Sequence, residues 1–406
     1  MKGLISDAIH NLDRIICRSG FRGHDPYDIL NNHLLIWLAR RSRWAGVALT
    51  QAFRLLPLNL RPILGIPRLP NAKTMALLAR AYLRLHVHSQ EEAYLERARV
   101  CLDWLDAHRS PGFGNACWGY SFPWCTVRQF LERDAPSIVC TSFVAHAFLD
   151  AYEVCGDGRH LAVACSACDF ILDDCPRIAK GQTYCFSYTP FGELPVHNAN
   201  LLGVSVLGRA YRHTGERSLL SAAVPALRYT LEDQNEDGSW YYHGPYSGRD
   251  GTIDNFHTGF VLECLRRFQA DTGCNGNDRL PKSLETSDVS ADVGRAVEQG
   301  QAFYEQRFFA ADGTPWRKVG QQYPLDIRDP AEFLVVMGQL EQLNESQHTL
   351  LENVLQWTFR TMQHRSGYFY FLRWRNWGCS PMYLRWQAWM LWALVSVLPL
   401  YGERRA

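Results

Sequence analysis

Apolar residues recur at helical spacing along most of the chain, and the helices that they predict are of two alternating kinds. One kind is apolar nearly all round, which is typical of helices shielded from water on every side. These inner-type helices are expected near residues 74–88, 138–154, 198–213, 254–269, 330–343 and 384–398. The other kind keeps a polar side, and these outer-type helices are expected near residues 28–43, 91–108, 159–174, 217–233, 291–308 and 347–364.

An internal repeat joins these helices into hairpins. Tyr82, Tyr152 and Tyr211 end the similar segments LLARAY, AFLDAY and VLGRAY. Gly156 and Gly215 then break the chain before the next helix. Each hairpin keeps an apolar face that a neighbouring hairpin can bury, so repeats of this kind stack side by side. We therefore predict an all-α fold in which six helical hairpins close into an (α/α)6 toroid.

A short loop rich in aromatic residues and glycine precedes most of the inner-type helices. Aromatic residues that alternate in so short a run indicate brief extended segments. Because each loop leads into the start of an inner helix, we expect these β-like loops to gather at one end of the toroid. The five loops span residues 115–124, 182–191, 236–244, 311–320 and 366–374.

Polar side chains stand at the expected starts of the inner helices, next to these loops. Some of them fit simple N-caps, which bond the free N–H groups of a first helical turn. The combination also suits a sugar, because aromatic faces cover its C–H surface while polar groups bond its hydroxyls. We therefore expect a polysaccharide or oligosaccharide substrate at this end. The candidate substrate-binding residues are Trp118, Tyr120, Arg128, Tyr188, Asn198, Asn200, Trp240, Tyr241, Asn255, Asp326, Arg328, Arg385 and Trp386.

The segment 238–260 holds the sharpest group of candidate catalytic residues. His257 follows Asp254 by three positions, which places the two on one face of a helix. A histidine held by a carboxylate is a candidate general base. Tyr242 is a candidate general acid, and His197 is a further candidate for proton transfer. The alternative is that His257 is a core histidine with satisfied hydrogen bonds and that Tyr242 is a platform for a sugar ring.

Charge is balanced over the whole chain but not along it. The 42 Lys and Arg residues against 41 Asp and Glu residues leave a net charge of +1, which argues against a nucleic-acid partner. Residues 29–90 carry nine basic residues and no acidic one. We expect residues 1–70 to form a basic helical arm packed on the toroid domain of residues 71–406. Residues 29–68 are basic and apolar, which fits either peripheral contact with an anionic membrane or a solvated basic face.

The start of the chain and the cysteines predict a cytoplasmic location. The first twenty residues contain Asp7 and Asp13 and lack the unbroken apolar stretch of a secretory signal. The thirteen cysteines are odd in number and scattered, which favours reduced thiols. No spacing of His and Cys defines a zinc site and no glycine-rich phosphate loop occurs, so we expect neither a metal nor a cofactor. Lipid contact by the arm would place the protein at the inner face of the membrane.

Six segments of the chain resemble the VpsJ-like family of bacterial exopolysaccharide (polysaccharide) biosynthesis proteins, over residues 20–395. The resemblance implies an α/α toroid similar to glucuronyl C5-epimerases, polysaccharide lyases and hydrolases, and terpenoid cyclases. It implies no particular catalytic residue. The segments are HDPYDILN (24–31), WGYSFPW (118–124), VHNANLLG (196–203), DGSWYY (237–242), DNFHTGFVLECL (254–265) and RWQAWML (385–391).

Several functions fit these residues. We expect an enzyme that modifies a bacterial polysaccharide or its lipid-linked precursor by proton transfer at a uronic acid, as an epimerase or lyase does. That chemistry needs a base and a cation for the sugar carboxylate, which Arg128, Arg328 or Arg385 can provide. The first alternative is a glycoside hydrolase, which needs a pair of carboxylates that no spacing selects. The second is a non-catalytic glycan-binding or scaffold subunit. An isoprenoid cyclase is disfavoured, because no DxDD or DDxxD motif occurs.

Overall fold

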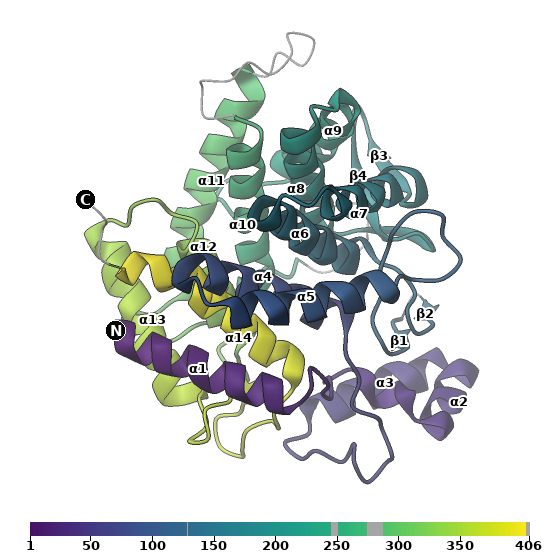
Figure 1. Ribbon diagram of the computed structural model, residues 1–406, viewed down its shortest axis with the longest axis vertical. Helices are drawn as coiled ribbons and strands as arrows, with labels where there is room; N and C mark the ends of the chain where they lie inside the picture. Colours follow the sequence, from purple (N-terminus) through teal and green to yellow (C-terminus); the bar gives the residue numbers. More distant parts are fainter. Residues whose placement is uncertain (128, 245–250, 274–286, 403–406) are drawn as a thin grey trace.

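Six helices form a closed inner ring in the computed structural model, which describes residues 1–127, 129–244, 251–273 and 287–402 (Figure 1). Each of these helices contacts the next one along the chain, and the last contacts the first. The ring is therefore closed by the contact between its last helix and its first helix. Its members are α4 (Ala72–Ser89), α6 (Ile138–Cys155), α8 (His197–Thr214), α10 (Asn255–Asp271), α12 (Arg328–Met337) and α14 (Leu384–Val397).

Six further helices pack around this ring. Five of them each follow an inner helix and lie against it, which confirms the (α/α)6 toroid. The sixth is the first helix of the chain, which packs on α14 and buries Ile5, Leu12 and Ile16 in the main core. The outer helices are α1 (Lys2–Arg18), α5 (Glu92–Ala107), α7 (Gly158–Asp169), α9 (Arg217–Glu232), α11 (Ser287–Phe308) and α13 (Glu345–Met362).

The prediction of one outer helix near residues 28–43 is wrong. The chain there forms a short 3-10 helix (Asp28–Asn31), then α2 (His33–Arg41) and α3 (Arg43–Leu55), which pack on each other. The physical reason is capping, because the side chain of Asn32 accepts backbone N–H groups and starts a new helix. The outer position is taken by α1. The domain division at residue 70 stays a prediction.

Two glycines end inner helices as the repeat predicts. Gly156 and Gly215 adopt left-handed backbone conformations, with φ of 71° and 70°. The N–H of each donates to the carbonyl of the repeated tyrosine four residues earlier, Tyr152 or Tyr211. Glycine adopts this conformation without steric cost, so the break between inner and outer helix is encoded locally.

Short antiparallel strands occur in the connections that lead from outer to inner helices. β1 (Trp124–Cys125) pairs with β2 (Phe130–Leu131), and β6 (Leu325–Asp326) pairs with β7 (Leu372–Arg373). The third sheet has the order β3 (Arg177–Lys180), β4 (Thr183–Thr189), β5 (Gly192–Pro195), with Cys185 of β4 opposite Ile178. The expected extended segments are therefore present in three of the five aromatic loops. The loops at 236–244 and 311–320 form only isolated bridges.

The helix α6 is the one helix among the described residues that is long and apolar enough to cross a membrane. It lies inside the protein, where it contacts α4, α7 and α8. Its apolar surface is therefore accounted for by the ring.

The segment between α1 and α4 docks at the end of the ring where the inner helices begin. Arg61 is fully buried and donates to Asp28, to the carbonyl oxygen of Pro26 at 2.9 Å and to the hydroxyl of Tyr383 at 2.8 Å. Tyr383 is the residue that precedes α14. A small apolar cluster that includes Ile29 joins this segment to the β1–β2 hairpin. The arm is thus held by buried polar contacts and covers part of this end.

The buried Arg61–Asp28 pair yields a stability prediction. We expect Arg61→Met to lower the free energy of unfolding by about 3 kcal/mol, because it leaves the Asp28 carboxylate buried without its partner. Urea denaturation measures this loss. Arg68→Met removes an exposed side chain that bonds only the Arg22 carbonyl, and it should change stability little. Equal effects of the two substitutions would contradict the docking role of Arg61.

Candidate functional site

His257 and Asp254 form a tight pair at the start of α10. Asp254 is the N-cap, and its Oδ1 accepts the backbone N–H of His257 at 3.0 Å. The same carboxylate lies 2.7 and 2.8 Å from Nδ1 of the His257 ring. The cap and the candidate base are therefore one unit. Because Nδ1–H donates to the carboxylate, Nε2 of His257 is left as the basic nitrogen.

The electrostatics of this pair suit a base. Burial alone would raise the pKa of Asp254, but the neighbouring His257 lowers it below its ordinary value. The Asp254 carboxylate is therefore charged and holds the ring through Nδ1. The His257 side chain keeps 27% of its surface exposed, and Nε2 has no hydrogen-bond partner among the described residues.

The two residues share a small cavity with Tyr242. The rings of Tyr242 and His257 lie 4.3 Å apart between centroids. Burial, with the charge of Asp254, raises the pKa of Tyr242, so its hydroxyl stays protonated. The cavity holds about 10 Å³, room for about one water. Candidate residues that line it are His197, Asn198, Trp240, Tyr241, Tyr242, Asp254 and His257.

His197 belongs to the wall of this cavity. Its Nδ1 lies 3.2 Å from Thr230 Oγ1, and its Nε2 lies 3.4 Å from Asp233. Burial, with the charge of Lys180, lowers the pKa of His197 to about 3, so the ring is neutral. Both nitrogens face protein partners. The expected role of His197 in proton transfer is therefore not supported by this geometry.

Four residues expected to bind substrate are buried with their polar atoms bonded inside the protein. Trp118 and Trp240 donate their indole N–H to the carbonyls of Leu105 and Thr230. Asn200 accepts the N–H of Phe186, and Asn255 donates to the carbonyl of Trp316. Trp118, Asn200 and Asn255 have no exposed surface, and Trp240 only 3%. The polar atoms of these residues bond the backbone of loops and helices. Because Trp118, Asn200 and Asn255 have no exposed surface, the prediction that they contact a sugar is wrong.

Arg328 and Asp326 form a second pair beside the first. The Arg328 Nε lies 2.9 Å from Asp326 Oδ1, and Asp326 is fully buried. The guanidinium lies 5.0 Å from the ring centroid of Phe256, the residue before His257. Burial would lower the pKa of Arg328, but Asp326 raises it above its ordinary value. The site therefore holds a guanidinium near the base that stays charged and is paired with the Asp326 carboxylate.

Arg385 and Trp386 face the arm. Arg385 pairs with Asp25 at 2.9 Å, and its guanidinium lies 4.6 Å from the Trp386 ring and 5.3 Å from the Tyr120 ring. Trp386 is itself buried. The Asp25 partner comes from a loop far away in the sequence, so only the structure shows that the arm already neutralises this cation.

Three further candidates remain, of which one lies outside the described residues. Tyr188 stands on β4, with its ring 5.7 Å from that of Trp124, and burial raises its pKa, as does the neighbouring Tyr120. Arg128 lies outside the described residues. Tyr241 is 44% exposed at the rim of the cavity.

Lys73 is a buried charged residue that the sequence analysis did not single out. Glu332, one of several carboxylates that the sequence offers to a glycoside hydrolase, is buried near it. The Lys73 ammonium lies 4.2 Å from the Phe143 ring and 4.5 Å from the Trp389 ring. Burial lowers the pKa of Lys73 to about 7. Burial, with Glu263 nearby, raises the pKa of Glu332 well above its ordinary value. In the sequence, each stands near the start of an inner helix, among mostly apolar neighbours.

Gly259 explains part of this packing. A Cβ atom there would lie 2.5 Å from Cγ of Glu332. The glycine of the DNFHTGF segment therefore lets α12 approach α10 closely near the end of the ring where the inner helices begin.

No group of three or more His, Cys, Asp or Glu side chains that could hold a metal ion occurs in the part of the chain that the structure describes.

Solved structures share the fold at low sequence identity. Cellobiose 2-epimerase from Bacillus thermoamylovorans matches with a TM-score of 0.62 and 12% identity, over 82% of this chain and 88% of that one. The GH76 alpha-mannanase of Bacteroides thetaiotaomicron gives 0.60 and 12%, over 82% and 87%. A polysaccharide lyase gives 0.56 and 14%, over 82% and 92%. No protein-family model matches the sequence, and no curated protein matches it. This likeness establishes the toroid fold.

The lowered pKa of Lys73 predicts a pH dependence of stability. Between about pH 7 and the ordinary lysine pKa, the unfolded chain holds a proton that the folded chain has lost, so the free energy of unfolding rises with pH. We expect this rise to reach about 1.4 kcal/mol per pH unit. Lys73→Met abolishes it, whereas the exposed Lys2→Met retains it.

Urea denaturation between about pH 6 and pH 9 measures this difference between wild type and Lys73→Met. If the difference between the two proteins is the same at every pH, Lys73 stays charged through its aromatic contacts. That result would contradict the predicted loss of its proton.

Proposed function

We propose that this chain is a carbohydrate-active enzyme with its active site at the end of the ring where the inner helices begin. The observation that carries the proposal is the His257–Asp254 pair, whose carboxylate bonds Nδ1 and leaves Nε2 exposed beside Tyr242. A histidine fixed in this way is a general base. The cavity beside this pair has room for about one water only, so a sugar would lie at its rim, where the exposed Tyr241 ring can cover an apolar sugar face.

The reaction that fits best is proton transfer at a sugar carbon next to a carbonyl or carboxylate group. His257 removes the proton, Tyr242 stands ready to donate one, and Arg328 stabilises the negative charge that develops on the substrate. Solved toroids of similar fold are named as a cellobiose 2-epimerase and a polysaccharide lyase. A uronic acid supplies both the acidic carbon and the carboxylate, so an epimerase or lyase acting on a uronic acid is our first choice.

A glycoside hydrolase of the same glycan fits the geometry less well. Its mechanism needs two carboxylates free to act at the glycosidic bond. Here Asp254 is bonded to His257, and Asp326 is fully buried against Arg328. One observation favours this alternative, because a similar solved structure is named as a mannanase. Product analysis separates the two, since a hydrolase releases reducing sugar without exchanging carbon-bound hydrogen.

We further propose that the substrate is a bacterial polysaccharide or its lipid-linked precursor. The resemblance to exopolysaccharide biosynthesis proteins supports this assignment. The arm supports the lipid-linked form, because it docks beside the site and carries apolar side chains on its outer surface. Trp44 is 70% exposed and Trp37 49%, and Arg41 stacks on Trp37 at 4.5 Å.

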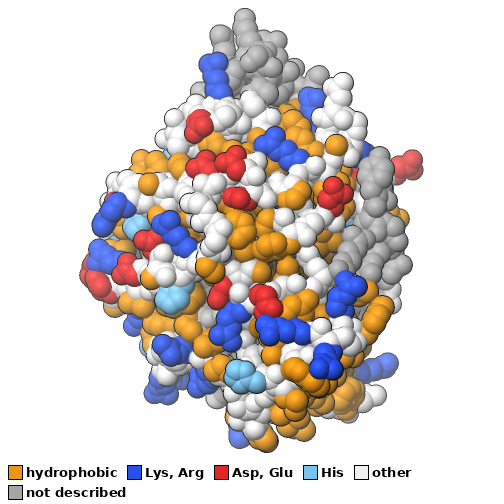
Figure 2. Space-filling view, turned by 90° about the vertical axis from the view of Figure 1, so that its right-hand side faces the viewer, with side chains coloured by type: hydrophobic (Ala, Val, Ile, Leu, Met, Phe, Trp, Pro, Cys, Tyr) orange, Lys and Arg blue, Asp and Glu red, His pale blue; other side chains and the backbone are white. Residues whose placement is uncertain are grey.

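The surface of the arm suits an anionic membrane. Exposed leucines such as Leu34 accompany these tryptophans, and Arg43 begins α3. In Figure 2, apolar and basic side chains adjoin one another at the lower end of the molecule, the height at which α2 and α3 lie in Figure 1. Apolar side chains enter the lipid interface while arginines attract anionic headgroups. Contact of this kind would bring the site to a lipid-linked sugar at the inner face of the membrane.

The catalytic proposal predicts that His257→Gln loses at least about 100-fold of the turnover rate, because the base is removed. Incorporation of solvent deuterium into uronate-containing polysaccharides, followed by NMR, measures the exchange, and near-ultraviolet absorbance reports lyase products. His10→Gln, an exposed histidine on α1, is the matched control. Full activity of His257→Gln would overturn the assignment, and binding without any turnover by wild type would favour a glycan-binding subunit.

The membrane proposal predicts that the protein floats with vesicles containing anionic phosphatidylglycerol and not with neutral phosphatidylcholine vesicles. We expect the double variant Trp37→Ser/Trp44→Ser to lose most of this binding, because it removes the two exposed anchors. Trp377→Ser removes a tryptophan that is 61% exposed in the loop before α14, and it serves as the control. Equal flotation of all three proteins, or of none, would reject the contact.

A further inference from the structure

A second cluster of charged side chains lies at the opposite end of the ring, where the inner helices end. It surrounds a cavity of about 470 Å³. Arg80 lies seven residues after Lys73 on α4, about two helical turns away from the candidate active site. The cavity is therefore separate from that site. The arginines that line it are Arg80, Arg84, Arg209, Arg212, Arg266 and Arg267, from α4, α8 and α10.

The positive charge of this cluster exceeds the negative charge around it. The ion pairs are Arg80–Asp150, Arg209–Asp150, Arg209–Glu153, Arg212–Asp271 and Arg267–Glu263. Arg84 and Arg266 have no carboxylate within 4 Å among the described residues. Six guanidinium groups thus meet four carboxylates, and two positive charges remain.

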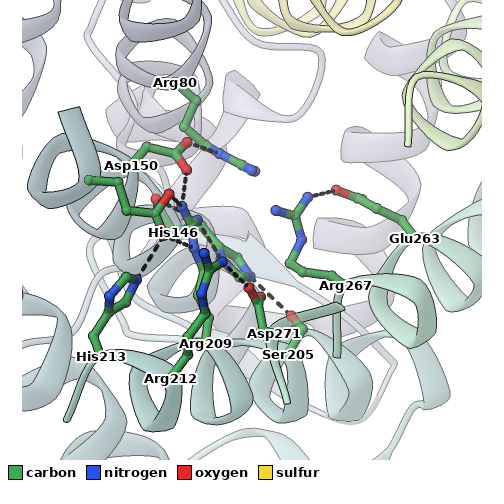
Figure 3. Close-up of polar contacts among 11 residues, drawn as sticks. Arg80, His146, Asp150, Ser205, Arg209, Arg212, His213, Glu263, Arg267 and Asp271 are labelled. Atoms are coloured by element: carbon green, nitrogen blue, oxygen red, sulfur yellow. Dashed lines mark hydrogen bonds and ion pairs between the residues drawn. The ribbon is translucent and has the colours of Figure 1, made fainter. Parts of the chain in front are cut away.

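Two of the guanidinium groups share one space without an anion between them. Figure 3 shows those of Arg80 and Arg267 turned toward each other, each bonded to a carboxylate on its far side. Burial lowers the pKa of Arg80, and the charge of Arg267 adds to that effect against the opposing charge of Asp150. Nη2 of Arg80 is buried without a hydrogen-bond partner among the described residues. A buried charged donor without a partner is unfavourable, and an anion in the cavity would satisfy it.

The composition of the cavity indicates which anion. Arginine matches phosphate through two parallel N–H bonds, and the cluster contains arginine and no lysine. Trp392 lies against it, 4.2 Å from the Arg80 guanidinium and 5.6 Å from that of Arg84, and adds a flat apolar wall. The volume is within the range of small-molecule sites. We propose that this cavity binds the phosphate groups of a small phosphorylated compound of the size of a sugar phosphate or a nucleoside diphosphate.

The helix ends offer a competing explanation for the arginines. Six inner helices direct their carbonyl ends, which carry partial negative charge, toward this end of the ring. Arg266 does donate to the carbonyl oxygen of Val336 at 3.4 Å. Attraction between arginines and helix carbonyls explains neither why Nη2 of Arg80 has no hydrogen-bond partner among the described residues nor why a cavity is present. The two explanations differ in whether a ligand binds in the cavity.

Isothermal titration calorimetry with pyrophosphate at low chloride tests the proposal. We expect wild type to bind, and Arg84→Gln and Arg266→Gln to weaken binding by about 10- to 100-fold, because each removes one charge-assisted contact. Arg99→Gln makes the same change of net charge on the exposed face of α5 and should bind like wild type. Inorganic phosphate, glucose 1-phosphate and uridine diphosphate, titrated in parallel, identify which form of phosphate fits.

A crystal soaked with tungstate gives a second measurement that does not depend on the variants. Anomalous scattering between Arg80 and Arg267 supports the site. Absence of heat with every phosphate probe at millimolar concentration, or equal affinity of Arg84→Gln and Arg99→Gln, overturns it. Preferential binding of an oligogalacturonate would assign the cavity to a uronate chain instead. Because every readout is binding, failure here leaves the proposed activity at the other end of the ring unaffected.

Discussion

The loops that lead into the inner helices must bond their backbone without belonging to a helix or a large sheet. Among the described residues, four inner helices meet this need with a polar side chain in the first turn that bonds the backbone of an aromatic residue. In three of them this residue lies in the loop before the same helix, and for α10 it lies in the loop before the next inner helix, α12. Buried backbone groups are nearly always paired, so these side chains decide where each loop lies. The pairs are Thr141 with Trp118, Asn200 with Phe186, Asn255 with Trp316, and Gln387 with Phe369.

This arrangement explains both the success and the error of reasoning from sequence. Repeated tyrosines and the glycines Gly156 and Gly215 are local signals, and they predict the hairpins and their breaks correctly. Asn200 and Asn255 are also visible in the sequence as polar residues at helix starts. The same pattern describes a sugar ligand and a buried loop anchor, and only the contacts separate the two. The His257–Asp254 contact is visible in the sequence because Asp254 stands three positions before His257, at the N-cap of the same helix.

Pairings between distant segments could not be predicted. Asp25 is 360 positions from Arg385, and nothing local marks either residue as the partner of the other. The place of α1 among the outer helices could not be predicted either. The basic stretch at 28–43 has the sequence pattern of an outer helix, so the sequence alone does not show which of the two segments packs on the ring. Tertiary packing on α14, not helix propensity, decides between the two. The cavity lined by Arg80 has no local sequence signal, because its arginines come from three helices that are far apart in the sequence.

The contact between α1 and α14 also constrains how the protein is made. The helices at the two ends of the sequence are neighbours in the ring, so α1 leaves the ribosome long before its partner exists. Until then the apolar face that carries Ile5, Leu12 and Ile16 has no permanent cover. Hairpins in between can form from local contacts, whereas closure joins residues far apart in the sequence, and contacts of that kind form more slowly. A nascent chain that has not yet reached α14 therefore lacks the partner of α1 and leaves apolar surface of this helix uncovered.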